Sequence, residues 1–101
     1  MKALKIDHVA QLIDIDNELK ALQEAVGGYI ETIGLQGGAV MIVDEEGRLK
    51  HKSANPLASL IAGIDIVGVA LITGVDEDEF DDVPAVYAEC ILQLSDIINA
   101  E

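Results

Sequence analysis

The most informative absence in this sequence is that of positive charge in its second half. Every lysine and arginine lies at or before Lys52, whereas residues 53–101 carry ten carboxylates. The whole chain has 6 basic and 19 acidic residues, and its net charge is -13. Because a surface this negative repels phosphate, the composition argues against ordinary binding to a nucleic-acid backbone or an anionic membrane. A charged partner is expected to be basic.

Cysteine and aromatic residues are also scarce. The single cysteine, Cys90, has no internal partner for a disulfide, so the fold needs no oxidising compartment. Only Tyr29, Phe80 and Tyr87 are aromatic, yet half of the residues are hydrophobic. This aliphatic content is far above the level at which highly charged chains stay disordered. The 101 residues are expected to form one soluble, folded domain.

No segment has the composition of a signal peptide or a membrane anchor. Charged residues interrupt the first eight positions, which leaves no room for a signal-peptide apolar region. Residues 54–75 come closest to a membrane span, with Asp65 as their only charge. A carboxylate near the centre of a span costs about 3 kcal/mol, and Pro56 and three glycines divide the stretch. The expected location is cytoplasmic, with no membrane partner.

The hydrophobic periodicity predicts a single α+β domain, in which two or three helices pack on a mostly antiparallel sheet of about five strands. The expected order is β-β-α-β-β-α-β-α. Strands are predicted at residues 3–7, 9–16, 29–35, 40–43 and 64–75, and helices at residues 18–26, 56–62 and 83–99.

Capping and turn residues indicate where these elements begin and end. Asp16 or Asn17 is expected to cap the first helix. The pair Asn55–Pro56 is a compact helix start, with asparagine as the cap and proline at the first helical position. Gly47 closes a turn and is expected to have a positive φ there.

The final helix, residues 83–99, has the clearest amphipathic pattern. Its large apolar residues fall in one arc of a helical projection, and this arc is expected to face the core. Cys90 lies in the arc, so it is expected to be a small buried hydrophobe. Leu92 projects onto the polar face, where it offers a small self-contact. The arc consists of Val83, Val86, Tyr87, Cys90, Ile91, Leu94, Ile97 and Ile98.

An acidic run at residues 76–82 is the first candidate site. It does not match a calcium-binding loop, because Asp81 and Tyr87 occupy the sixth and twelfth positions, where glycine and glutamate are needed. The structural interpretation is an exposed connection that favours the following helix N-terminus and keeps the preceding strand from pairing. The functional interpretation is a partner-binding site made of Asp76, Glu77, Asp78, Glu79, Asp81 and Asp82.

No catalytic or metal-binding constellation is evident elsewhere. Asp65 is the only acid in apolar surroundings, but it has no assignable catalytic companion and is simply interpreted as a turn or cap residue. His8 and His51 lack Cys or His neighbours at metal-ligand spacing. The basic segment 48–52 is interpreted as an internal strip of ion pairs, with anion binding as the alternative. The chain is expected to be non-catalytic and to need no cofactor, and an enzyme would need a pocket around Asp65 or His51.

Four segments stand out as a set: 22–31 (LQEAVGGYIE), 44–47 (DEEG), 55–58 (NPLA) and 67–72 (VGVALI). Together, and in this order, they resemble a family of small bacterial and phage proteins catalogued as a domain of unknown function, number three-eight-four-six. The resemblance covers roughly residues 2–75 and leaves out the acidic connection and the final helix. It implies cargo of phages and conjugative elements with no agreed activity, so it assigns no site residue.

These observations predict a small acidic interaction module. The sharper hypothesis is a DNA mimic that occupies a nucleic-acid-binding protein. An extended run at 76–82 would place successive residues about 3.3 Å apart, close to roughly 3.4 Å per phosphate along one DNA strand. The resemblance to mobile-element proteins adds to this hypothesis. The alternative is a homo-oligomeric structural or accessory domain whose acidity serves only solubility.

Overall fold

The computed structural model describes residues 1–99. Within these residues the chain forms one six-stranded sheet and three helices, so the predicted α+β class is confirmed, with one strand more than expected. The elements are β1 (Lys2–Ile6), β2 (Ala10–Asp14), α1 (Leu19–Val26), β3 (Ile30–Gly34), β4 (Ala39–Asp44), α2 (Pro56–Ala62), β5 (Ala70–Asp76), β6 (Glu79–Asp81) and α3 (Ala85–Ile98).

The sheet is built around β5. Its strand order is β2-β1-β5-β4-β3, and all the pairs are antiparallel. β5 pairs with β1 through residues 70–72 and with β4 through residues 71–74, and its far end pairs with the short strand β6. The hairpins β1–β2 and β3–β4 are therefore joined through β5.

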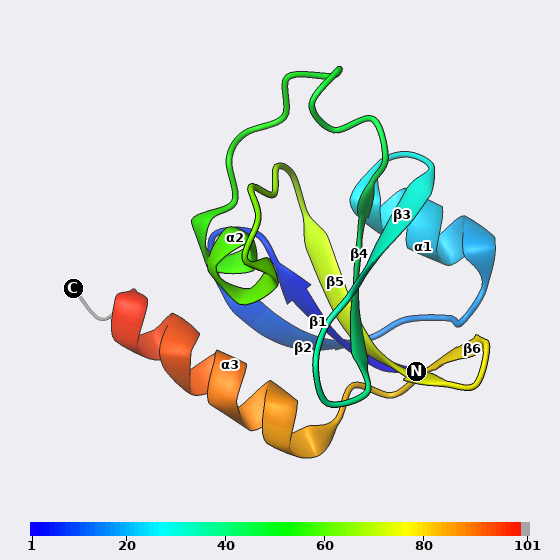
Figure 1. Cartoon of the computed structure of the whole chain (residues 1–101), viewed down its shortest axis with the longest axis vertical. Helices are drawn as coiled ribbons and strands as arrows, with labels where there is room; N and C mark the ends of the chain where they lie inside the picture. Colours follow the sequence, from blue (N-terminus) through cyan, green and yellow to red (C-terminus); the bar gives the residue numbers. More distant parts are fainter. Residues whose placement is uncertain (100–101) are drawn as a thin grey trace.

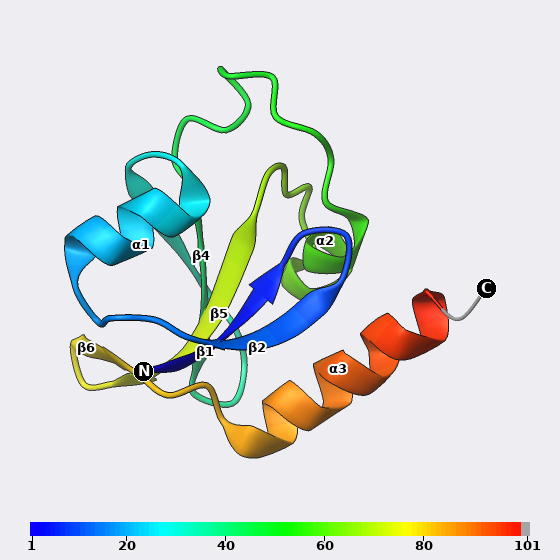
Figure 2. The same cartoon turned by 180° about the vertical axis from the view of Figure 1, so that it is seen from behind.

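Helices cover both faces of the sheet (Figures 1 and 2). α1 lies on one face, where Leu22 packs in a cluster with Ile42 and Leu71. α2 and α3 lie on the other face, over a larger cluster that includes Met41 and Ile72. Because neighbouring residues of a strand point to opposite faces, β4 and the first part of β5 are buried on both sides, as their aliphatic sequences predict.

The second helix follows its capping signal. Asn55 is 3% exposed, and its Oδ1 accepts the N–H of Ala58 at 3.2 Å. Its Nδ2 donates to the carbonyl oxygens of Ile6 at 3.0 Å and Gly68 at 2.8 Å. One buried side chain thus starts α2 and ties it to β1 and to the segment before β5.

Two other local predictions are wrong. Glu18, rather than Asp16 or Asn17, precedes α1, and its side chain makes no capping hydrogen bond. Gly47 does not have a positive φ. Its small size meets a packing need instead, because a Cβ there would lie 3.0 Å from Cγ2 of Val67.

The predicted strand at 64–75 is shorter than expected. β5 begins only at Ala70, and Gly68 before it has a φ of 75°, which extended strands do not adopt. Residues 54–75, the stretch closest to a membrane span, are divided among α2, a loop and β5. No helix in the described part of the chain has both the length and the apolarity to cross a membrane.

α3 begins and ends close to the predicted positions, but only part of the predicted arc faces the core, with Ile91 buried. Ala88 and Ser95 are buried, and Leu92, which was expected on the polar face, packs against the core. The Oγ of Ser95 accepts the N–H of Ala10 at 2.9 Å. Small residues let the helix approach the edge of the sheet at β2, and this approach sets the rotation of the helix.

Candidate interaction surface

The acidic run folds into a hairpin rather than an open connection. β5 ends at Asp76, the turn consists of Glu77 and Asp78, and β6 begins at Glu79. Glu77 has a φ of 57°, a left-handed conformation that residues with a side chain rarely adopt. All six carboxylates of the run are exposed. The strand β6 is the element that the sequence did not predict.

The pairing register separates the polar and apolar side chains of this hairpin. Val75 faces Phe80 across the two strands, and Asp76 faces Glu79. Since side chains alternate between the faces, Phe80 reaches the α1 side, where it packs against the smaller core cluster. Asp76 and Glu79 share the other face, although like charges directly opposite each other are unfavourable. The apolar packing of Phe80 offsets this repulsion.

The base of the hairpin is fixed to the first strand. Oδ1 of Asp82 accepts the N–H of Lys2 at 2.7 Å, and the N–H of Val83 donates to the Lys2 carbonyl oxygen at 2.9 Å. Gly74 makes this close approach feasible, because a Cβ there would overlap the carbonyl oxygen of Asp82. Asp82 therefore has a structural contact. The side chains of residues 76–79 have no hydrogen bond or ion pair within residues 1–99.

A second acidic segment, distant in sequence, lies beside the hairpin. It consists of Asp14, the last residue of β2, and the link to α1, which contributes Asp16 and Glu18. Nδ2 of Asn17 in this link donates to the carbonyl oxygen of Phe80 at 2.8 Å, and Nζ of Lys2 contacts Oδ2 of Asp14 at 2.6 Å. The two segments together form a surface that we call the acidic end: Asp14, Asp16, Glu18, Asp76, Glu77, Asp78, Glu79, Asp81 and Asp82.

Within residues 1–99, Lys2 is the basic side chain that forms an ion pair with this surface, through Asp14. Its hydrogen bond with Asp14 raises the pKa of Lys2 and lowers the pKa of Asp14. Both groups therefore stay charged at neutral pH, and the pair neutralises one carboxylate of the acidic end.

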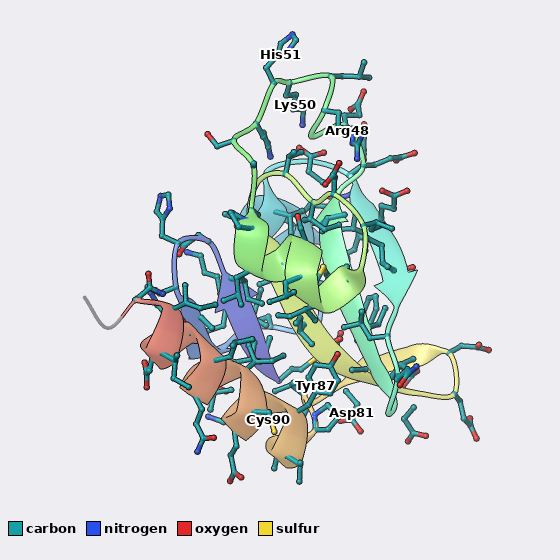
Figure 3. All side chains as sticks on the ribbon, turned by 60° about the vertical axis from the view of Figure 1, so that its left-hand side comes forward. Arg48, Lys50, His51, Asp81, Tyr87 and Cys90 are labelled. Carbon is teal, nitrogen blue, oxygen red and sulfur yellow. The ribbon has the colours of Figure 1, made fainter. Side chains whose placement is uncertain are left out.

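The predicted ion-pair strip lies at the opposite end of the molecule. Figure 3 shows Arg48 and Lys50 far from Asp81. Asp44, whose side chain is 1% exposed, contacts Nζ of Lys50 at 2.9 Å and Nζ of Lys52 at 2.7 Å. The internal ion-pair interpretation of the basic segment is thus confirmed for both lysines.

These lysines also complete the C-terminus of α1. Nζ of Lys50 donates to the carbonyl oxygen of Gly27 at 3.0 Å, and Nζ of Lys52 donates to that of Val26 at 2.7 Å. Burial alone would raise the pKa of Asp44. Hydrogen bonds from both lysines and from a backbone N–H outweigh burial and hold this pKa well below its usual range.

An apolar hollow adjoins the acidic end at the start of α3. It has a volume of about 550 Å³, and Ile61, Pro84, Val86 and Tyr87 are among the residues that line it. Pro84 follows Asp82 of the acidic end by two positions. Burial raises the pKa of Tyr87, which indicates apolar surroundings, and no hydrogen bond within residues 1–99 uses its hydroxyl. The hollow thus combines apolar walls with one polar group.

Several side chains that were expected to be buried lie exposed on α3. Val86 and Ile97 are each 73% exposed, and Cys90 is exposed as well. The expectation that the whole apolar arc faces the core is therefore wrong. Part of it forms the outer surface around the hollow.

The remaining candidate residues do not converge. Asp65 lines a cavity of about 180 Å³ with Arg48 and Glu31, and the Arg48 guanidinium donates to the Asp65 carbonyl oxygen at 3.1 Å. His51 is exposed in the loop between β4 and α2, and His8 is exposed after β1. Within residues 1–99 no group of three or more His, Cys, Asp or Glu side chains is arranged to hold a metal ion.

The fold and this surface define a small acidic α+β domain with an exposed acidic hairpin. The chain belongs to the family described as Domain of unknown function (DUF3846), whose model matches residues 1–95. The match extends beyond residue 75, where the sequence resemblance ended, so the hairpin and most of α3 are parts of the family domain. No curated protein and no solved structure matches the chain.

Proposed function

We propose that the protein is a non-catalytic interaction module that binds a basic surface of a partner protein through the acidic end. One observation carries this proposal: two acidic segments that are far apart in sequence converge at one end of the fold. Opposite charge across an interface speeds association and excludes wrong partners. The lysines at the other end are engaged in internal contacts and leave the acidic end unopposed.

The sharper form of the proposal is mimicry of DNA toward a nucleic-acid-binding protein. The chain reverses at Glu77 and Asp78, so the spacing along one extended strand does not apply. The hairpin presents carboxylates on two strands about 4.8 Å apart, and the segment 14–18 widens this array. A basic groove of the partner that binds DNA phosphates would bind this array of carboxylates in their place, and no base-specific contact would be needed.

Replacing the six acids of the hairpin run by amides is the direct test. The amides keep the shape and the acceptor oxygens, including the contact of Asp82 with Lys2. Partners captured from a host lysate by the wild-type protein and released at moderate salt are expected to be lost with this variant, because screening weakens exposed charge pairs. If a captured partner binds DNA, the wild-type protein is expected to compete with that DNA for the partner. This competition tests mimicry.

A matched variant separates charge in general from charge at this place. Six exposed acids outside the acidic end are replaced by amides, which gives the same net charge. Capture is expected to persist with this control. Equal loss in both variants, or capture that neither affects, contradicts the proposal. The control positions are Glu24, Glu31, Glu45, Asp65, Glu89 and Asp96.

The hollow beside the acidic end would take an apolar side chain from the same basic partner segment. Val86→Glu is expected to weaken partner binding about tenfold, since burying a valine contributes roughly 1.5 kcal/mol. Stability should be unchanged, because Val86 is 73% exposed. The added carboxylate would itself attract a basic partner, so a loss of affinity isolates the apolar contact.

Leu49→Glu is the control for this substitution. Leu49 is 77% exposed in the loop with Arg48 and Lys50, at the other end of the molecule. It adds the same charge, and binding is expected to be unaffected. A calorimetric titration with a captured partner measures both variants, and equal affinities for the two would remove the hollow from the interface.

The second candidate function is a homo-oligomeric structural or accessory domain. Leu92, the residue that raised this idea, packs on the core and is not a surface contact. Self-association therefore needs another surface, and the open edge of the sheet at β3 provides one.

A further inference from the structure

The two edges of the sheet differ in how they are protected. At the β2 edge, α3 lies alongside and Ser95 accepts the N–H of Ala10 at 2.9 Å. Asp14, farther along the same strand, is paired with Lys2. Natural proteins cover or charge exposed edges in this way to prevent pairing with another chain.

The edge at β3 is less protected, because Glu31 is its one charged residue. Its sequence, IETIG, contains no lysine and no proline, and its register with β4 is continuous over all five residues, without a bulge. No residue of β3 is fully buried. Within residues 1–99 no other segment pairs with its outer side. This is the kind of edge that accepts an additional strand.

The hydrogen bonds of the β3–β4 hairpin identify the groups left free on this edge. The N–H of Leu35 donates to the carbonyl oxygen of Ala39, and the N–H of Glu45 donates to that of Tyr29. Antiparallel pairs alternate between bonded and non-bonded positions. The residues that face β4 are therefore the odd-numbered ones, and the N–H and C=O groups of Ile30, Thr32 and Gly34 point outward.

We propose that β3 pairs antiparallel with β3 of a second copy of this chain, around a twofold axis at Thr32. In this register Thr32 bonds its own counterpart, and Ile30 bonds Gly34 of the second copy. All three outward-facing residues are satisfied on each copy, and the two sheets become one. This proposal does not depend on the acidic end having a partner.

The side chains also fit this register. Glu31 lies opposite Ile33 of the second copy, so no carboxylate faces another carboxylate. Tyr29, which is 66% exposed, lies opposite the partly buried Leu35 and would gain an apolar contact at each end of the pair. A register centred on Glu31 would instead place like charges directly opposite, which is unfavourable.

The acidic ends do not prevent this contact. β4 and β5 separate β3 from the acidic hairpin, and three strand spacings amount to about 14 Å. Each acidic end is thus farther from the axis than the Debye length of about 8 Å at physiological salt. Salt screens the remaining repulsion between two chains of charge -13, so salt should strengthen self-association. It should weaken binding at the acidic end, and this opposite response distinguishes the two interactions.

Sedimentation equilibrium of the full chain tests the proposal at low and high salt. A contact this small is expected to be weak, with dimers appearing between about 10 µM and 1 mM and increasing with salt. Thr32→Pro removes only an outward N–H, which edge strands tolerate, so the β3–β4 ladder stays intact. We expect the dissociation constant of this variant to rise at least tenfold with an unchanged circular dichroism spectrum.

Disulfide cross-linking tests the register in which the two β3 strands pair. This test does not require the proline variant to fold. In a Cys90→Ser background, Thr32→Cys is expected to form a cross-linked dimer, because a bonded pair has its Cα atoms about 5.5 Å apart. Glu31→Cys should not cross-link, because its two copies are offset by two residues. A strict monomer at high salt, a dimer that Thr32→Pro leaves unchanged, or cross-linking at Glu31→Cys alone would overturn the proposal.

Discussion

Asp44→Asn is expected to lower the free energy of unfolding by about 3 kcal/mol, the lower end of the range for breaking a buried ion pair. The lower end applies because Lys50 and Lys52 keep contact with water, with side chains 39% and 24% exposed. The asparagine cannot neutralise the two ammonium groups, and the loop that they tie to the end of α1 is loosened. Urea unfolding at pH 7 measures the difference.

The pH dependence identifies the charge of Asp44 as the cause. Its pKa is lowered in the folded protein, so its contribution is present above the unfolded pKa of about 3.9. This contribution is lost as the pH falls below that value. The gap between wild type and Asp44→Asn should therefore narrow toward pH 3. Asp65→Asn, which changes an exposed carboxylate, should show no such gap, and a constant gap for Asp44→Asn would contradict this account.

Asn55→Ala is expected to cost about 3 kcal/mol, because it removes a helix cap worth about 1 kcal/mol and leaves two carbonyl groups unpaired at roughly 1 kcal/mol or more each. The unpaired carbonyls belong to Ile6 and Gly68. Thermal unfolding by circular dichroism measures the loss, and a decrease below 1 kcal/mol would show that these bonds are replaced by water.

Asn55→Asp separates the cap from the two other bonds. Aspartate keeps an oxygen for the N–H of Ala58 but has no donor for the carbonyls of Ile6 and Gly68. We expect it to remain strongly destabilised. Full recovery of stability by aspartate would mean that Asn55 matters only as a cap, and that its contacts with β1 and the segment before β5 contribute little.

Some local signals were sufficient, although the predicted cap of α1 and the predicted φ of Gly47 were wrong. Asn55–Pro56 predicted the start of α2, and Gly63, with a φ of 75°, ends it. Gly27, with a φ of 82°, likewise ends α1. These features depend on backbone geometry and on hydrogen bonds within a few residues, which the sequence displays directly.

Contacts between segments that are distant in the chain could not be predicted from the sequence. The run 76–82 looks like a solvated connection because its charges repel, but the packing of Phe80 against the core and the contact of Asp82 with β1 hold it as a hairpin. The contribution of residues 14–18 to the acidic end depends on β1 lying between β2 and β5. The carboxylates themselves were visible in the sequence, but the strand order that brings them together was not.

The prediction of which side of α3 faces the core was wrong in part, for a related reason. A helical projection assigns the largest apolar arc to the core, but the small side chain of Ser95 is buried and accepts a hydrogen bond from β2. The burial of Asp44 could not be predicted for the same reason, because its contacts with Lys50 and Lys52 depend on how the following loop folds back.

The central place of β5 has a consequence for how the chain folds during synthesis. The two hairpins β1–β2 and β3–β4 leave the ribosome before β5 does, and an isolated two-stranded hairpin is at best marginally stable in water. Pairing β1 with β5 closes a loop of more than sixty residues, and such long-range pairing is slow. The aliphatic strands of the nascent chain therefore stay exposed until β5 emerges. Repulsion between its many carboxylates and those of neighbouring chains would limit aggregation during this time.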